Sequence, residues 1–282
     1  MSLKDNRKLS FVIVFIVYVL ASVGGVFIFN ALNYDLWLNL LIADVCATVI
    51  TFIFSLIFTN ASVYDPYWSV KPLVICLGLL LSGTSLMAII MVTCVCAWGV
   101  RLTANWAYTF HGLTHQDWRY TMLKEKTGAF YPLINFLGIH MFPTLVVYAC
   151  VLPVVYAITM AIPTTVFGFL GCLISVCAIA LQTVSDVQMQ AYRKHKKTPF
   201  ICVGLWKYSR HPNYLGEILM WWGMALTFTL TVPSMWYLAL GALINTLMFL
   251  VVSIPMADGR QAKKQGFNEY KTHTSMLLPI KK

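Results

Sequence analysis

Charged residues are scarce in this sequence. They make up 11% of the 282 residues, only 10 positions are Asp or Glu, and hydrophobic types reach 59%. A soluble domain is usually about 25% charged and about 45–50% apolar. A shortage of this size excludes an ordinary water-soluble globule, because so many apolar side chains need lipid as well as a protein interior to face. The sequence therefore predicts an integral membrane protein.

Disulfide and metal-binding patterns are lacking as well. The eight cysteines form no CxxC pair, and nearly all lie within or beside apolar runs, so we interpret them as buried reduced thiols. His111 and His115 are four residues apart, but no third ligand lies nearby in the sequence, so we expect no metal site. Since internal repeats and a soluble domain-sized segment are also missing, we expect one membrane domain over residues 1–282.

Long apolar runs are what the sequence has in abundance. A membrane-spanning helix needs about 20 mainly apolar residues. The run that begins at Phe11 continues too far for a signal peptide, and no small-x-small site clearly ends it. We therefore predict an all-α protein with about seven transmembrane helices, near residues 10–31, 36–59, 72–98, 133–153, 163–185, 212–231 and 234–254.

The basic residues predict how the chain is threaded. With seven spans, the 98–132 loop, the 186–211 loop and the C-terminal tail share one side and carry 16 of the 20 Lys and Arg residues. The positive-inside rule then places the C-terminus in the cytosol and the N-terminus outside. The other side carries Lys4, Arg7, Lys8 and Lys71. The first three of these favour the opposite orientation, so a helix count that differs by one stays open.

The net charge of +10 has two candidate causes, which are anionic lipid beside the loops and an anionic ligand such as a nucleotide phosphate. Nucleic acid is not expected, because the basic residues belong to membrane loops rather than to a separate basic domain.

Polar residues gather in the C-terminal half. Gln182, Asp186, Gln190 and Arg193 recur at helical spacing and so share one face. Ionisable residues at a membrane helix end indicate a functional site, although solvated charges at an ordinary helix end are the alternative.

The run that follows, YSRHPNYLGE, places Pro212 at the first position of a helix. Arg210, His211 and Asn213 crowd this helix N-terminus, where free N–H groups favour an anion. Glu217 and Trp221 follow at one-turn intervals on the face of Asn213, an arrangement that suits a planar amide-bearing ring or a ribose. Anchoring of Arg210 and His211 at the membrane boundary, and simple packing of Trp221, are the alternatives.

The run YSRHPNYLGE resembles the C-terminal signature of the steroid 5α-reductase-like membrane family, in particular its bacterial DUF1295 branch. DPYW at 65–68, WGVRLTANW at 98–106, DWRY at 117–120 and EYKTHTSMLLP at 269–279 are similar to the same branch. The resemblance implies seven transmembrane helices and reduction of an activated carbon–carbon double bond with NADPH from the cytosol. It also implies a bacterial inner-membrane protein.

The resemblance assigns residue roles as expectations. Residues 161–282 are the cofactor-binding half, and residues 1–160 face a hydrophobic small-molecule substrate that arrives through the bilayer. The residues expected to bind NADPH are Arg101, Arg119, Gln182, Asp186, Arg193, Arg210, His211, Asn213, Tyr214, Glu217 and Trp221.

The substrate-binding residues depart from the family pattern. Vertebrate members hold the substrate carbonyl with a glutamate and a tyrosine, and here Trp98 stands where that tyrosine is expected. We predict that Asp65 donates a proton to the substrate carbonyl, because burial raises a carboxyl pKa. Tyr64 and Tyr67, which flank it, are the other predicted catalytic residues, since either can donate in the same way. An Asp-Pro turn is the alternative for Asp65. A 3-oxo-4-ene steroid is the expected type of substrate.

Two other functions remain as alternatives. RHPxY with a later glutamate also occurs in isoprenylcysteine and phospholipid methyltransferases, which use S-adenosylmethionine. The arginine surplus and the Gln182–Asp186–Arg193 face favour the reductase. A transporter often shows two repeated halves with paired broken helices, and here the polar groups gather in one half only.

Overall fold

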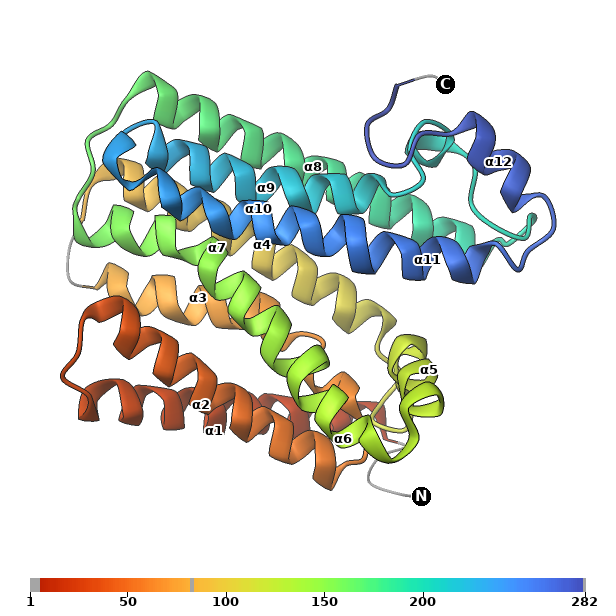
Figure 1. Cartoon of the computed structure of the whole chain (residues 1–282), viewed down its shortest axis with the longest axis horizontal. Coiled ribbons are helices and arrows are strands. Elements are labelled where there is room, and N and C mark those ends of the chain that lie inside the picture. Colours follow the sequence, from red (N-terminus) through yellow and green to blue (C-terminus); the bar gives the residue numbers. More distant parts are fainter. Residues whose placement is uncertain (1–5, 82–83, 281–282) are drawn as a thin grey trace. The chain divides into compact units, whose positions relative to one another are not determined.

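The computed structural model describes residues 6–81 and 84–280, and every regular element in that part is a helix (Figure 1). The extended pairing there is an isolated bridge between Ser209 and Ser275. The prediction of an all-α protein is therefore confirmed. Lys4, Lys281 and Lys282, which entered the charge count, lie outside the described residues.

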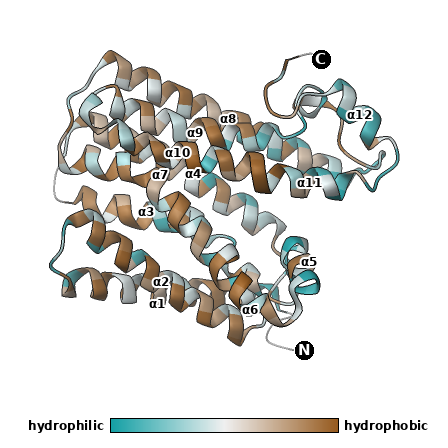
Figure 2. Cartoon of the chain, viewed as in Figure 1, coloured by the Kyte–Doolittle hydropathy of each residue, from teal (hydrophilic) through white to brown (hydrophobic). Residues whose placement is uncertain are grey.

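Apolar helices long enough to cross a bilayer dominate the described chain. Hydrophobic residues run along them, and hydrophilic residues gather around α5 (Trp118–Thr127) and α12 (Phe267–His273) (Figure 2). Large side chains such as Phe15, Phe27 and Val166 are exposed, as lipid-facing positions require. The prediction of a multi-pass membrane protein is confirmed by six candidate spans among the described residues: Arg7–Ala31, Leu36–Ile57, Leu86–Thr109, Trp118–Thr159, Val166–Lys194 and Pro233–Gln261.

The prediction of one helix over 72–98 is wrong. Two helices occupy this stretch, α3 (Tyr67–Leu80) and α4 (Leu86–Thr109). The sequence between them, LSGTS, carries glycine and small hydroxyl residues that weaken a helix, although the hydropathy around it stays high. The count of seven spans and the orientation of the chain stay predictions.

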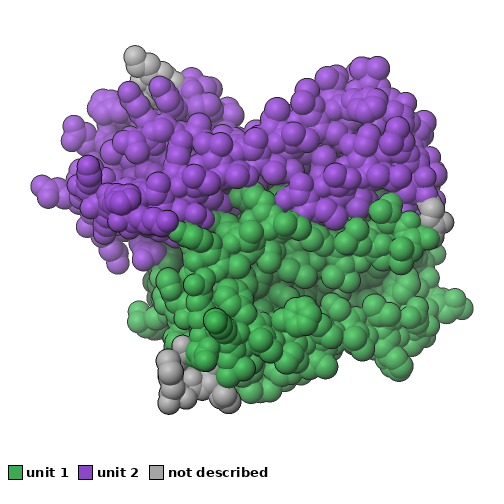
Figure 3. All heavy atoms as spheres, turned by 180° about the vertical axis from the view of Figure 1, so that it is seen from behind, with its two compact units in different colours: residues 1–82, 98–155 green, residues 83–97, 156–282 purple. Residues whose placement is uncertain are grey.

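The chain divides into two compact units, which are coloured separately in Figure 3. The first unit contains residues 1–82 and 98–155, and the second contains residues 83–97 and 156–282. The helices of the first unit include α1 (Arg7–Ala31), α2 (Leu36–Ile57), η1 (Ala61–Tyr64), α3, the end of α4, α5, η2 (Gly128–Phe130), α6 (Tyr131–Ile134), η3 (Asn135–Met141) and most of α7 (Phe142–Thr159).

The first unit is built on the antiparallel pair α1 and α2. The side chain of Asn39 closes their short connection, accepting from the Tyr34 amide at 3.1 Å and donating to the Leu32 carbonyl at 3.4 Å. The Tyr18 hydroxyl of α1 donates to the Val63 carbonyl of η1 at 2.7 Å. This bond ties the connector that follows α2 to α1.

The second unit is built on α8 (Val166–Lys194) and α9 (Pro212–Thr229), which lie side by side in Figure 1. Small residues bring their backbones together, because a Cβ on Gly223 would lie 2.6 Å from the Gly171 carbonyl oxygen. Small residues at such crossings are typical of membrane helix pairs. The other helices of this unit include the start of α4, the last residues of α7, η4 (Gly204–Lys207), η5 (Pro233–Ala239), α10 (Leu240–Met248), η6 (Phe249–Ser253), α11 (Ile254–Gln261) and α12.

Candidate functional site

A buried carboxylate lies at the contact of α8 and α9. Glu217 accepts a 2.9 Å hydrogen bond from the side-chain amide of Gln182, and a second of 2.9 Å from the indole of Trp221. All three side chains are buried. The contact depends on Gly216, where a Cβ would lie 2.4 Å from Cγ of Gln182. The structure therefore brings together three residues that the sequence predicted for one site.

Two amide oxygens beside this carboxylate lack a protein donor. Oδ1 of Asn213, in the first turn of α9, and Oε1 of Gln182 are buried atoms with no hydrogen-bond partner. Such atoms are rare in folded proteins, because each one loses its bond to water and gains nothing in return. One of these acceptors belongs to the side chain that binds Glu217, and the other lies one turn before Glu217 on α9. Two such acceptors suit a ligand that brings N–H donors, and a carboxamide is such a ligand.

The other predicted residues of α8 lie toward its C-terminal end. Asp186 follows Gln182 by one turn and is half-buried, and Arg193 is exposed in the last turn of the helix. A row that changes from buried amide to exposed guanidinium fits a long ligand with a polar, charged end.

Arg210 and His211 do not point freely to solvent. The Arg210 guanidinium bonds Asp258 of α11 through Nη2 at 3.0 Å, and it donates to the Thr274 carbonyl at 2.6 Å. Nε2 of His211 lies 2.9 Å from the same carboxylate, and the ring of Tyr214 stacks on that of His211 at 5.2 Å. These contacts hold the C-terminal segment against the start of α9, a structural role that the sequence did not predict.

Arg101 and Arg119 belong to the first unit. Arg101 lies within α4 rather than in a loop. Arg119 pairs with Asp117, with 2.8 Å between Nε and Oδ1.

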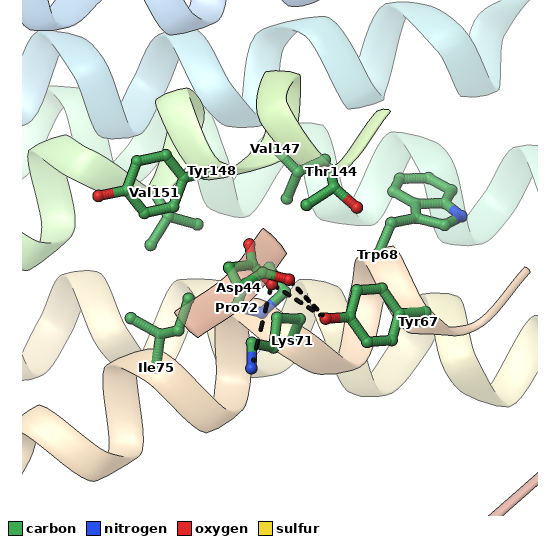
Figure 4. A pocket seen from close by; sticks show the side chains of 10 residues that line it. All are labelled: Asp44, Tyr67, Trp68, Lys71, Pro72, Ile75, Thr144, Val147, Tyr148 and Val151. Atoms are coloured by element: carbon green, nitrogen blue, oxygen red, sulfur yellow. Dashed lines mark hydrogen bonds and ion pairs between the residues drawn. The ribbon is translucent and has the colours of Figure 1, made fainter. Parts of the chain in front are cut away.

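A pocket in the first unit, lined by residues of α2, α3 and α7, contains an acid, a base and a phenol (Figure 4). The Tyr67 hydroxyl donates to Oδ1 of Asp44 at 3.0 Å, and Nζ of Lys71 lies 4.0 Å from the same oxygen. Asp44 is 3% exposed and Lys71 is 8% exposed. Space for Lys71 comes from Gly25 of α1, because a Cβ there would lie 3.3 Å from Nζ. The other residues that line the pocket include Trp68, Pro72, Ile75, Thr144, Val147, Tyr148 and Val151.

The predicted catalytic residues are only partly found in this pocket. Tyr67 lines it, whereas the Tyr64 hydroxyl bonds Thr144 at 2.8 Å. Asp65 is not among the lining residues, because it follows η1 and accepts a 2.7 Å bond from Tyr120. Burial raises the pKa of Asp65 to about 6, although the nearby Arg119 charge opposes this shift.

The carboxyl group of the pocket is Asp44, which the sequence analysis missed. The available signal was an acidic residue in the middle of the apolar run 36–59, because an intramembrane ionisable residue indicates a functional site. Lys71 was counted as a loop cation and lies inside α3.

The comparison with known families decides the family. The family described as "Protein of unknown function (DUF1295)" matches residues 51–274. The chain belongs to the DUF1295 family. The matched range includes the α8–α9 contact and Tyr67 and Lys71 of the pocket, but Asp44 precedes it.

A curated relative of this DUF1295 protein is the uncharacterized protein C594.04c of Schizosaccharomyces pombe. The two are 28% identical over 193 residues, which cover 57% of this chain and 56% of the relative. The chain thus spans little more than half the length of that protein. No solved structure matches the chain.

Proposed function

We propose that this protein is a membrane-embedded reductase of the steroid 5α-reductase type. It reduces the activated carbon–carbon double bond of a hydrophobic enone with NADPH, and a 3-oxo-4-ene steroid is the substrate class that we favour. The observation that carries the proposal is the Asp44–Tyr67 pair, 3.0 Å apart and beside Lys71, in a pocket lined by α2, α3 and α7. A buried phenol backed by a carboxyl is a suitable partner for a carbonyl oxygen that gains negative charge during reaction.

The residues of the α8–α9 contact fit the nicotinamide end of NADPH. The two buried acceptors without donors, Oδ1 of Asn213 and Oε1 of Gln182, match the N–H groups of a carboxamide. Glu217 holds Gln182 in place through the 2.9 Å bond, and Trp221 fixes Glu217 in turn. The exposed guanidinium of Arg193 is available to phosphate oxygens.

The chemistry divides between the cofactor and the side chains. NADPH, when bound, supplies a hydride to the β-carbon of the enone. Tyr67 donates a hydrogen bond to the carbonyl oxygen, which becomes the enolate oxygen as the hydride arrives. Asp44 accepts the Tyr67 O–H when the substrate is absent. Once that single proton points to the substrate carbonyl, a protonated Asp44 would donate to the Tyr67 oxygen and keep the phenol oriented. One proton must then reach the enolate α-carbon, so each turnover consumes one hydride and one proton.

The test uses the purified protein in detergent with NADPH and a 3-oxo-4-ene steroid. We expect NADPH consumption that depends on the enone and a product with the carbon–carbon bond reduced. Tyr67→Phe and Asp44→Asn are expected to slow turnover by about 10²–10⁴-fold, the usual effect of removing a positioned proton donor. Asp35→Asn is the matched control, because Asp35 precedes the same helix, is exposed and makes no side-chain capping bond.

A binding measurement distinguishes the reductase from a methyltransferase. The signature RHPNY with the later Glu217 is also found in enzymes that use S-adenosylmethionine. Saturable binding of NADPH, absent for S-adenosylmethionine, supports the reductase. The reverse result, or unchanged NADPH consumption in Asp44→Asn and Tyr67→Phe, contradicts it.

A further inference from the structure

A row of buried hydroxyl groups leads away from Asp44 in the first unit. Next to Asp44 is the Tyr67 hydroxyl at 3.0 Å, and Oγ1 of Thr48 lies 3.4 Å from that hydroxyl. Thr48 lies 3.1 Å from Oγ1 of Thr144, and Thr144 lies 2.8 Å from the Tyr64 hydroxyl. Four hydrogen bonds therefore connect a carboxyl in the middle of α2 with the connector η1 that follows this helix.

These hydroxyls are fully enclosed. Thr48 is 0% exposed, Tyr64 is 2% exposed, and Tyr67 and Thr144 are each 3% exposed. A buried threonine in a helix is commonly satisfied by its own backbone, as Thr51 is through the Ala47 carbonyl at 3.0 Å. Thr144 instead bonds hydroxyls from two other elements, α2 and η1. Helix stability alone does not require such a chain of side-chain contacts.

The bonds can all point the same way. Thr48 donates toward Tyr67, and Tyr67 donates toward Asp44. Either oxygen can be the donor in the Thr48–Thr144 and Tyr64–Thr144 bonds. A row with one polarity lets each hydroxyl pass its own proton forward and accept another from behind. The weakest step is the 3.4 Å contact of Thr48 with Tyr67, because Thr48 has a single proton and the Asp44 carbonyl, at 2.8 Å, is the nearer acceptor for it. The relay therefore requires this hydroxyl to turn from the Asp44 carbonyl to Tyr67.

An acid follows the outer end of the row in the chain. Asp65 comes directly after Tyr64 and is half-buried, its charge acts on the Tyr64 hydroxyl, and the Tyr120 hydroxyl donates to it. Because its pKa is raised to about 6, Asp65 exchanges protons with water near neutral pH. Burial raises the pKa of Tyr64, so its hydroxyl stays protonated and acts as a bridge rather than as an acid.

We propose that Tyr64, Thr144, Thr48 and Tyr67 form a proton relay that carries protons from the helix connector, where Asp65 follows Tyr64, to Asp44 in the pocket. The relay moves one proton per passage and no electrons, since one proton enters the row at Tyr64 and Asp44 gains one at the other end. Its use rests on the proposed reductase function, in which the proton consumed with each hydride has to reach a buried pocket. Intramembrane acids linked by polar side chains serve proton movement in other membrane proteins.

The relay is tested without NADPH or any enone. The protein in lipid nanodiscs receives a pulse of photoreleased protons that lowers the pH from about 8 to about 5, a range that contains the raised pKa of about 6 of Asp65. Time-resolved infrared spectroscopy follows the carboxyl band of Asp44, assigned by its loss in Asp44→Asn. We expect Thr48→Val and Thr144→Val to slow this protonation by about tenfold or more, as loss of a proton-transfer group does.

Matched variants separate proton transfer from packing. Thr144→Ser keeps the hydroxyl and is expected to restore the rate. Thr51 lies in α2 like Thr48 and is also 0% exposed, but it bonds its own backbone. We therefore expect Thr51→Val to leave the rate of Asp44 protonation unchanged. Wild-type rates in both relay variants overturn the relay, and so does equal slowing in Thr51→Val. A protein that shows the expected slowing but reduces no enone retains the relay and loses the proposed reductase function.

Discussion

Gln182 of α8 donates a 2.9 Å hydrogen bond to Glu217 of α9 at the level where Gly216 lets the two helices touch. The bond joins residues 35 positions apart in the chain. It makes the candidate cofactor site depend directly on helix packing, because a change in the helix contact moves the amide that holds the carboxylate.

Substitution of Glu217 is expected to weaken NADPH binding. Glu217→Gln keeps the shape but turns one acceptor into a donor, so either the Gln182 amide or the Trp221 indole faces another N–H group. A buried N–H donor without an acceptor costs about 1–3 kcal/mol. We expect the dissociation constant for NADPH to rise by about tenfold to a hundredfold, measured by titration of the purified protein. Glu269→Gln, an exposed carboxylate of the same unit, should bind as the wild type does. Equal affinities in wild type and Glu217→Gln contradict the site assignment.

The contact between α8 and α9 is tested by adding one methyl group at Gly216. In Gly216→Ala the new Cβ would lie 2.8 Å from the Ala178 carbonyl oxygen as well as near Gln182, so α9 has to shift. We expect a loss of about 1–3 kcal/mol in the free energy of unfolding, seen as a lower Tm in detergent. Gly259→Ala is the matched control, because nothing lies within 4 Å of its Cβ, and an alanine in helix α11 should be neutral or mildly stabilising. Equal Tm values in the two variants contradict the packing argument.

Some of this architecture was accessible from the sequence and some was not. The apolar runs predicted the membrane helices, and Pro212 predicted where α9 begins, because both signals are local. The prediction of one helix over 72–98 was wrong because hydropathy averages over a short run of small polar residues. Local patterns also do not tell which helix faces meet, so the pairing of Gln182 with Glu217 and the position of Tyr67 beside Asp44 required the three-dimensional structure.

The link between α9 and the C-terminal segment depends on Asp258. This carboxylate lies 3.0 Å from Arg210 and 2.9 Å from His211, and Nζ of Lys271 lies 3.8 Å away. Asp258→Asn leaves the buried guanidinium of Arg210 without its partner charge, which usually costs about 3–5 kcal/mol. We expect α12 to detach and trypsin to cut at Lys271 much faster than in the wild type. Glu269→Gln on the same segment should be cut at the wild-type rate, because it leaves this link intact. Rapid cleavage of Glu269→Gln, or a wild-type rate in Asp258→Asn, would show that the link does not hold the segment.

Asp65 is expected to make stability depend on pH in a defined window. Burial raises its folded pKa to about 6 from the ordinary value of 3.8, so the folded protein holds this proton more tightly than the unfolded chain. The contribution to stability is therefore fully present below about pH 4 and is lost as the pH rises through about 6. It is worth less than about 3 kcal/mol, because the side chain is only half-buried and water screens its charge. Asp65→Asn removes the titrating group and with it this pH dependence. As the pH rises from 4 to 6, we therefore expect the Tm of the variant to increase relative to the Tm of the wild type. Parallel Tm curves for the two proteins across this window would show that the Asp65 carboxyl titrates normally, and it would then exchange protons at too low a pH to serve the relay near neutrality.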